Sequence, residues 1–277
     1  MSHIALQRII VRMLYDPTFA DAVYRDASEA LSGVELSESD VTMLLEADRR
    51  AWRLDPMRRT RALQALLEEY PVACALVAHT TDQGAQLDLF FSSSHFHRAI
   101  QERGSLALAF GSYLAVLAGR LDRRDVEAFA HLEEAIARSR RPRPHSQGEV
   151  PVGTVRLADG IKLVRVPRGV IRRFGEIRER MTRAGLNGGQ LVLSTEVRLE
   201  AMPVESQEEI ALVEPCEMGE GPTLTILEDA LAAALIQADP GTSKEALFER
   251  LRSHGAESGE EEEILEALIE DGLLMNS

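Results

Sequence analysis

The sequence predicts an α+β protein in which an all-helical N-terminal domain is followed by a smaller domain built around a β-sheet. Apolar residues recur at helical spacing through the first 139 residues, whereas alternation with a period of two begins only at Thr154. Between these regions, segment 140–153 is rich in proline, arginine and glycine and lacks apolar periodicity, as is typical of a linker. We therefore predict a helical domain at 1–139, a linker at 140–153 and a second domain at 154–277.

Helix starts in the first domain are marked by short polar residues that can accept hydrogen bonds from a first helical turn. Asp16 and Asp55 each precede a proline, which suits the first position of a helix. Ser37 and Asp40 have the spacing of a capping box, and Asp122 precedes the last helix of this domain. Together with the apolar spacing, these signals predict about six helices.

The second domain begins with strands. Two alternating runs within 154–166 are joined by Asp159-Gly160, a pair that predicts a β-hairpin. A basic helix is expected over 169–184. The glycine-rich segment 185–189 is expected to be a turn, because it precedes a predicted strand rather than a helix. The further strands are predicted over 191–199, over 209–213 and within 223–226.

Helical spacing returns after these strands. It predicts helices over 227–237, over 244–253 with Ser243 as the N-cap, and over 260–271. Strands followed by three short helices and then Gly272-Leu273-Leu274 describe a small winged-helix domain over 190–277.

The charge balance limits the partners that such a domain can have. The chain holds 31 Lys and Arg against 45 Asp and Glu, a net charge of −14. Residues 148–277 carry 13 basic and 25 acidic residues, and the third winged helix opens with Glu260–Glu263. Because binding to nucleic-acid phosphates needs cationic surface, DNA recognition is disfavoured, and a winged-helix transcriptional regulator is kept as the alternative function.

The location of the protein is predicted from what the sequence lacks. The first residues have no apolar signal core, and no apolar run approaches the ~20 residues that span a bilayer. We therefore expect a cytoplasmic protein.

Few residues in the sequence suggest catalysis or metal binding. His95 and His97 would share one face of a strand but not of a helix, and their surroundings look helical, so no metal site is predicted. Cys74 lies among apolar residues and is expected to be buried, whereas acidic neighbours make Cys216 a poor nucleophile. Neither a nucleophile elbow nor a phosphate-binding loop is present, so we predict no catalytic residues and no cofactor.

One segment has the composition of an interaction surface. Residues 48–61 hold six arginines and the only tryptophan of the chain. The segment is either a solvated helix face with internal Asp–Arg pairs, or an interface, because Trp and Arg are enriched at binding hot spots. The predicted partner-interface residues are Arg49, Arg50, Trp52, Arg53, Arg58 and Arg59.

A second candidate site is the edge of the predicted winged-helix sheet. An extended peptide can add a strand to a free sheet edge, using main-chain hydrogen bonds and apolar pockets rather than positive charge. We place this edge at Thr223, Leu224, Thr225 and Ile226, with a pocket beside Ile264 and Leu268. The competing interpretation is that Ile264 and Leu268, one helical turn apart, both belong to the core.

Two parts of the sequence resemble known proteins. The run from Glu209–Val213 through Leu227–Leu235 and Thr242–Phe248 to Ile264–Leu274 is similar to the precursor-peptide recognition element of ribosomal peptide biosynthesis. The run Leu6–Ile10, Tyr15-Asp16-Pro17, Asp26–Leu31 and Leu36-Ser37 resembles the helical region of partner subunits of multinuclear non-haem iron oxidases. Those subunits include the companion proteins of methanobactin and thiaglutamate biosynthesis.

The resemblance implies a role without catalysis. In these systems a barrel-shaped oxidase holds the irons, while the companion subunit binds the precursor leader and presents its cysteine for modification. We therefore expect a peptide-binding subunit with two partners, a ribosomal precursor peptide and a barrel-type iron oxidase. The resemblance assigns no role to the hairpin and basic helix at 154–184. An enzyme that uses His95, His97 and a distant carboxylate is the third hypothesis.

Overall fold

The computed structural model describes residues 3–81, 84–141, 153–215, 222–239, 241–257 and 259–276. The chain is mostly helical and carries two small antiparallel sheets, which confirms the predicted α+β class. It divides into two compact units. Unit 1 comprises Met1–Ala130 and Arg178–Met202, and unit 2 comprises His131–Ile177 and Pro203–Ser277. Most of the predicted linker, 142–152, lies outside the described residues.

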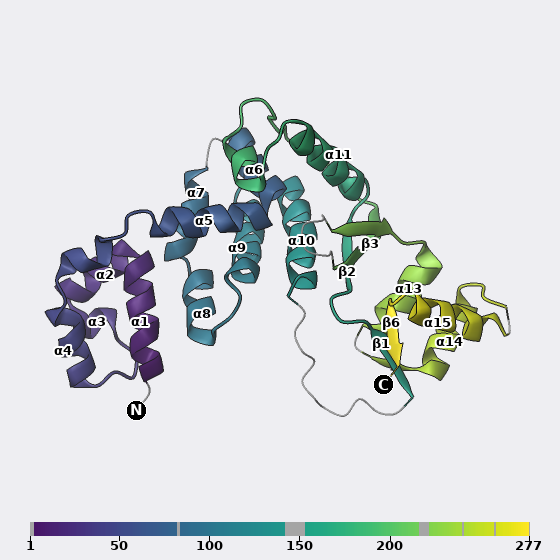
Figure 1. Cartoon of the computed structure of the whole chain (residues 1–277), viewed down its shortest axis with the longest axis horizontal. Helices are drawn as coiled ribbons and strands as arrows, with labels where there is room; N and C mark the ends of the chain where they lie inside the picture. The colour runs from purple at the N-terminus through teal and green to yellow at the C-terminus, as the bar shows by residue number, and fades with distance from the viewer. Residues whose placement is uncertain are drawn as a thin grey trace. The chain divides into compact units, whose positions relative to one another are not determined.

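The N-terminal part is helical, as predicted, with more and shorter helices than the sequence indicated (Figure 1). The elements are α1 (His3–Tyr15), α2 (Pro17–Arg25), α3 (Ala27–Ala30), α4 (Glu38–Glu46), the 3₁₀ helix η1 (Arg49–Arg53), α5 (Arg58–Glu69), α6 (Pro71–Thr81), α7 (Ala85–Asp88), the 3₁₀ helix η2 (Leu89–Ser92), α8 (Ser94–Glu102), α9 (Leu106–Arg120) and α10 (Arg124–Ser139).

Side-chain caps define several of these helix starts. The Asp16 carboxylate accepts a hydrogen bond from the Phe19 N–H at 3.2 Å, and Ser37 and Asp40 form the predicted capping box. The helix start predicted at Asp55-Pro56 was wrong, because the helix begins two residues after Pro56. The Asp55 carboxylate accepts from the Met57 N–H at 3.1 Å, but the α-helix begins at Arg58 because residues 56–57 form a turn first.

Two clusters of side chains hold the helices of unit 1. Around α1 and α2, Met13, Val23 and Leu44 are buried in an aliphatic cluster that Trp52 partly covers. Further along the chain an aromatic cluster forms, in which the Phe90 ring lies 5.1 Å from Phe110 in an edge-to-face arrangement. The apolar residues that recur at helical spacing in the sequence are thus the ones that these helices bury.

The segment after the basic helix differs from its prediction. Residues 188–193 form α12 (Gly188–Leu193), not the start of a strand over 191–199, and the predicted turn at 185–189 ends in this helix. The Asn187 side chain accepts from the Gln190 N–H at 2.8 Å, and the Gln190 side chain accepts from the Asn187 N–H at 2.9 Å. This capping box starts a helix, and α12 then packs on α5 and α6. The predicted second domain, 154–277, thus includes a segment that belongs to unit 1.

The predicted hairpin at 154–166 is also wrong, although both of its strands form. The first strand, β1 (Thr154–Leu157), pairs with β5 (Thr242–Ser243) and β6 (Leu274–Asn276), whereas β2 (Lys162–Pro167) belongs to the other sheet. Only Gly160 of the central pair has a positive φ, +88°. A two-residue hairpin of type I′ needs positive φ at both positions, so this turn splays the two strands apart.

The second sheet has the order β2–β3–β4, with β3 (Glu208–Glu214) in the centre and β4 (Thr223–Ile226) at an edge. Both β3 and β4 lie where the sequence predicted strands, and the basic helix is α11 (Val170–Arg183). The three predicted winged-helix helices are α13 (Asp229–Ala238), α14 (Lys244–Ser253) and α15 (Glu260–Glu270).

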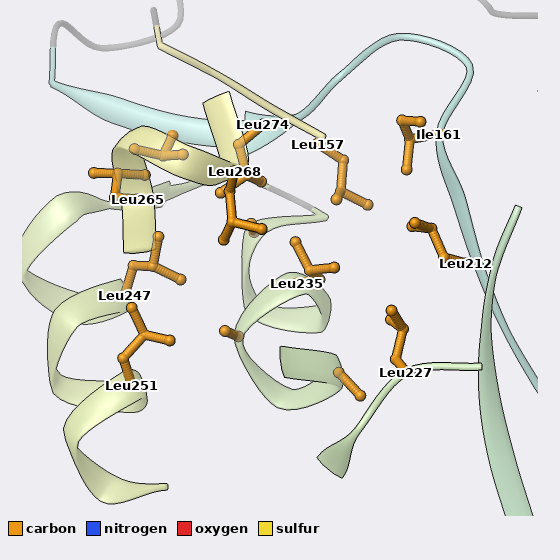
Figure 2. Packing of buried hydrophobic residues seen from close by; sticks show 14 residues of the cluster. Leu157, Ile161, Leu212, Leu227, Leu235, Leu247, Leu251, Leu265, Leu268 and Leu274 are labelled. Atoms are coloured by element: carbon orange, nitrogen blue, oxygen red, sulfur yellow. The ribbon is translucent and has the colours of Figure 1, made fainter. Parts of the chain in front are cut away.

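These three helices enclose one leucine-rich core next to both sheets (Figure 1). Figure 2 shows Leu235, Leu247 and Leu268 pointing toward one another from α13, α14 and α15. Leu212 of β3 and Leu227, which follows β4, face this core from the side of the second sheet. In the chain, β4 therefore comes directly before the three helices. In its sheet it is an edge strand, with β3 on one side.

Candidate functional site

The candidate site is the edge strand β4. Within the part of the chain that the structure describes, it pairs with β3 alone, antiparallel, in a register that sets Ala211 opposite Ile226 and Val213 opposite Leu224. The next residue, Leu227, donates its N–H to the Ile210 carbonyl at 3.0 Å. This hydrogen bond fixes which backbone groups of β4 are already used.

Backbone groups in an antiparallel strand point alternately toward one neighbour and the other. Because Leu227 bonds to β3, Thr225 directs its N–H and C=O to β3 as well, opposite Leu212. The N–H and C=O groups of Leu224 and Ile226 consequently point away from β3. An extended chain laid along β4 would meet two donors and two acceptors from these two residues.

The side chains of β4 are accessible. The Ile226 side chain is among the exposed large hydrophobic groups, at 51%, while Thr223 and Thr225 are exposed and Leu224 is half-buried. The opposite edge strand, β2, exposes only Arg165 among its six residues and ends at Pro167. Of the two edges of this sheet, β4 is the one that offers both backbone groups and an apolar side chain.

The pocket predicted beside α15 is only partly available. Leu268 is 6% exposed and points into the leucine core (Figure 2), and Ile264 is half-buried against the same core. The interpretation that both residues belong to the core fits this burial. In this structure the candidate site is therefore the β4 edge itself, without a pocket formed by Leu268.

Acidic residues flank the edge. Glu214 lies opposite Thr223 at one end of β4, and the exposed Glu228 lies two residues after Ile226 at the other end. The acidic start of α15 is partly neutralised, because the buried Glu261 accepts from the Gly259 N–H at 2.6 Å and lies 3.0 Å from Arg252 of α14. That ion pair also occupies one of the three cations of α14, the helix that a DNA-binding winged helix would need to be basic.

The arginine-rich segment makes internal contacts at its first end. The Arg49 and Arg53 guanidinium groups both contact the Asp21 carboxylate, at 2.6 and 3.0 Å. The Trp52 indole packs on the aliphatic cluster of α1 and α2 and donates to the Tyr24 hydroxyl at 2.8 Å. Trp52 therefore stabilises unit 1 whether or not it also contacts a partner, whereas the Arg49 and Arg53 ion pairs are exposed and contribute little to stability.

The second end of the segment is paired as well. Arg59 contacts Asp88 at 2.5 Å, and Arg58 lies 3.9 Å from Asp55 and donates to the Leu14 carbonyl. Between the two ends, Arg50 is exposed, and Leu54 at 78% is among the most exposed large hydrophobic residues. The surface available to a partner is thus centred on Arg50 and Leu54 rather than on the paired arginines.

The two histidines lie on α8, as their helical surroundings indicated, and they face different neighbours. The His97 Nε2 atom lies 3.5 Å from the buried Asp16 carboxylate, whereas the His95 ring centroid is 6.2 Å from that of Tyr113. Burial raises the pKa of Asp16, but nearby His97, the Phe19 N–H and the charge of Arg12 outweigh it and hold that pKa below its ordinary value. Asp16 therefore remains a carboxylate between α1 and α8.

Cys74 is fully buried in α6, as predicted, and Cys216 lies outside the described residues. Within the described ranges, no group of three or more His, Cys, Asp or Glu side chains is arranged to hold a metal ion. Over the same part of the chain, every helix is too short or too polar to cross a bilayer.

Comparisons with known proteins add no relative to this description. The chain matches no protein-family model, and a search of curated proteins finds no similar sequence. The geometry of β4 and its surroundings is therefore the basis for a functional proposal.

Proposed function

We propose that this chain is a peptide-binding subunit that captures the leader of a ribosomal precursor peptide as an added strand on β4. The observation that carries the proposal is the free edge of β4, where Leu224 and Ile226 direct their backbone groups away from β3 and Ile226 exposes its side chain. The position of this edge, directly before three packed helices, agrees with the order of elements in precursor-peptide recognition elements.

In strand addition, the backbone and the side chains of the bound peptide contribute differently to binding. Main-chain hydrogen bonds to Leu224 and Ile226 would supply affinity for almost any extended sequence. Every second side chain of the added strand would share a face with Ile226, so an apolar leader residue there would be favoured. Because Glu214 and Glu228 flank the edge, a leader with lysine or arginine near its ends would bind more tightly, and less so at high salt.

The proposal extends to a second partner. We propose that a barrel-type multinuclear iron oxidase binds the same chain and modifies a cysteine of the captured precursor. The iron would belong to the oxidase, and the role of this chain would be to hold and orient the substrate. The exposed Arg50 and Leu54, which lie between paired arginines, support a partner surface on unit 1.

Amide chemical shifts test the peptide site. The ¹⁵N-labelled chain would be titrated with the precursor peptide encoded beside its gene, and shifts are expected in 223–227 of the β4 edge. Shifts confined to the N-terminal helices, with none in 223–226 or 260–271, would show that the winged-helix region is not the receptor.

Co-expression tests the oxidase. A tagged chain is expected to co-purify with the neighbouring barrel-type oxidase, and iron should follow the oxidase when the two are separated. Iron that remains with the isolated chain, and is lost when His95 and His97 are both changed to alanine, would favour the enzyme hypothesis instead.

A further inference from the structure

A pair of adjoining grooves on unit 1 carries an arginine that has no partner among the described residues. The larger groove, of about 840 Å³, runs between α1 and the segment Gly33–Leu36, and Gln101 of α8 also lines it. The smaller groove, of about 270 Å³, runs between α1 and the end of α8. Arg8 lines both, so it lies where the two grooves meet.

The Arg8 side chain is partly buried, but its hydrogen-bond donors are not satisfied within the described structure. Its Nε atom is buried, and among the described residues no hydrogen bond or ion pair engages its guanidinium group. A buried donor without an acceptor destabilises the protein, so a ligand that supplies an acceptor would recover that loss. A guanidinium group is best matched by a carboxylate, which can accept two parallel hydrogen bonds.

The neighbouring arginine shows that this state is specific to Arg8. Arg12 lies one turn further along α1, and its Nε atom is also buried without a hydrogen bond. However, its guanidinium carbon lies 3.6 Å from the centre of the Phe19 ring, and the charge of Asp16 acts on it. The Arg12 guanidinium group therefore interacts with Phe19 and Asp16 of the protein itself, whereas the Arg8 guanidinium group faces the two grooves.

The groove walls indicate what surrounds the expected carboxylate. Aliphatic side chains line both grooves, with Val34 and Leu36 in the larger one and Val11 and Ile100 in the smaller one. The other charged residues of the lining are Glu35 in the larger groove, which makes no ion pair with Arg8, and Arg103 in the smaller one, which adds a second positive charge. A free phosphate would gain nothing from such walls, whereas a peptide with aliphatic residues on both sides of an acidic one would bury them. We propose that these grooves bind a peptide segment of a partner protein in which a glutamate or aspartate lies between aliphatic residues, with Arg8 as its anchor.

This site is separate from β4, so it can be tested without reference to the proposed function. The probe is a blocked nonapeptide with one central glutamate, two valines on each side and serines at both ends. Its counterpart has glutamine at the centre. In titrations of the full ¹⁵N-labelled chain, amide shifts are expected in 5–9, 33–36 and 99–104, and the glutamate peptide should bind about tenfold more tightly than the glutamine peptide.

Three variants decide the interpretation. Arg8→Gln should abolish the preference for glutamate, whereas Arg25→Gln, which changes an exposed arginine that lines neither groove, should retain it. Gln101→Glu places a carboxylate in the groove at an exposed position and should weaken binding of the glutamate peptide even if Arg8→Gln fails to fold. Equal affinities for the two peptides, absence of binding, or an unchanged preference in Gln101→Glu would overturn the proposal.

Discussion

The imidazole of His79 accepts a hydrogen bond at Nδ1 from the backbone N–H of Leu199, at 3.1 Å, although 120 residues separate them. Its Nε2 atom lies 3.2 Å from the Val192 carbonyl oxygen. Because Nδ1 is the acceptor, Nε2 carries the proton and donates a hydrogen bond to the Val192 carbonyl oxygen. A neutral imidazole thus joins α6 to the last turn of α12, through Val192, and to the segment that follows it, through Leu199.

This arrangement predicts a pH-dependent stability. Burial, and to a lesser degree the charge of Arg198, hold the pKa of His79 below its ordinary value, while hydrogen bonding to Val192 opposes them. The unfolded state therefore binds a proton more readily than the folded state. The contribution of His79 to the free energy of unfolding is complete above the unfolded pKa of about 6.5 and declines as the pH falls below it.

His79→Ala should lower the free energy of unfolding by about 1–3 kcal/mol at pH 7, because the Leu199 N–H and the Val192 carbonyl lose their partner. It should also flatten the decline between pH 7 and pH 5, as measured by chemical denaturation at a series of pH values. The control is His131→Ala at an exposed position, which should keep the decline. An identical pH dependence in wild type and His79→Ala would contradict the assigned tautomer.

A second prediction concerns the contact between α12 and the α5–α6 junction. A Cβ atom added at Gly188 would lie 2.9 Å from the Glu68 Cα atom and 3.0 Å from the Leu67 carbonyl oxygen, both of which are backbone atoms. Gly188→Ala should therefore destabilise the protein by about 1–3 kcal/mol. Gly175→Ala, in the middle of α11 with open space around it, should instead stabilise it by about 0.5–1 kcal/mol. Thermal unfolding of both variants measures the difference, and a stabilised Gly188→Ala would show that α12 does not approach α5 this closely.

A third prediction separates stability from association in the arginine-rich segment. Trp52→Ala should destabilise unit 1, because the indole packs on the α1–α2 cluster and donates to Tyr24. The double change Arg50→Ala and Leu54→Ala removes exposed side chains and should leave the unfolding transition in place. If this surface binds the oxidase, the double variant should weaken association by about 2 kcal/mol, as measured by titration calorimetry. A folded double variant with unchanged affinity would leave the segment as a solvated face with internal ion pairs.

Local signals in the sequence account for the elements that were predicted correctly. Asp16 and Ser37 each begin a helix, because their side chains accept a hydrogen bond from the backbone N–H three residues later. Such a contact can be predicted from the spacing of residues alone. The alternation Thr-Leu-Thr-Ile correctly predicted the strand β4, because a period of two can also be read from the local sequence.

The errors arose where distant contacts decide the structure. The partner of β1 that replaces the predicted hairpin is β6, at the far end of the chain, and no local pattern identifies it. The run Leu191-Val192-Leu193 has the composition of a strand, but the capping box at Asn187 and packing on α5 and α6 make it helical. The position of Arg8 between two grooves could not be predicted, because it depends on which side chains α8 and Gly33–Leu36 place beside α1.

The central claim is that β4 receives an extended peptide through the outward N–H and C=O groups of Leu224 and Ile226. Ile226→Pro removes one outward N–H while the hydrogen bonds of Thr225 and Leu227 to β3 remain. Ile226→Thr is the matched control, because it shortens the same exposed side chain and keeps the N–H. The measurement is the affinity of a fluorescent precursor leader for the wild type and both variants, by anisotropy titration. We predict that Ile226→Pro binds at least about tenfold more weakly than Ile226→Thr. Equal affinities of the two folded variants would contradict strand addition at β4.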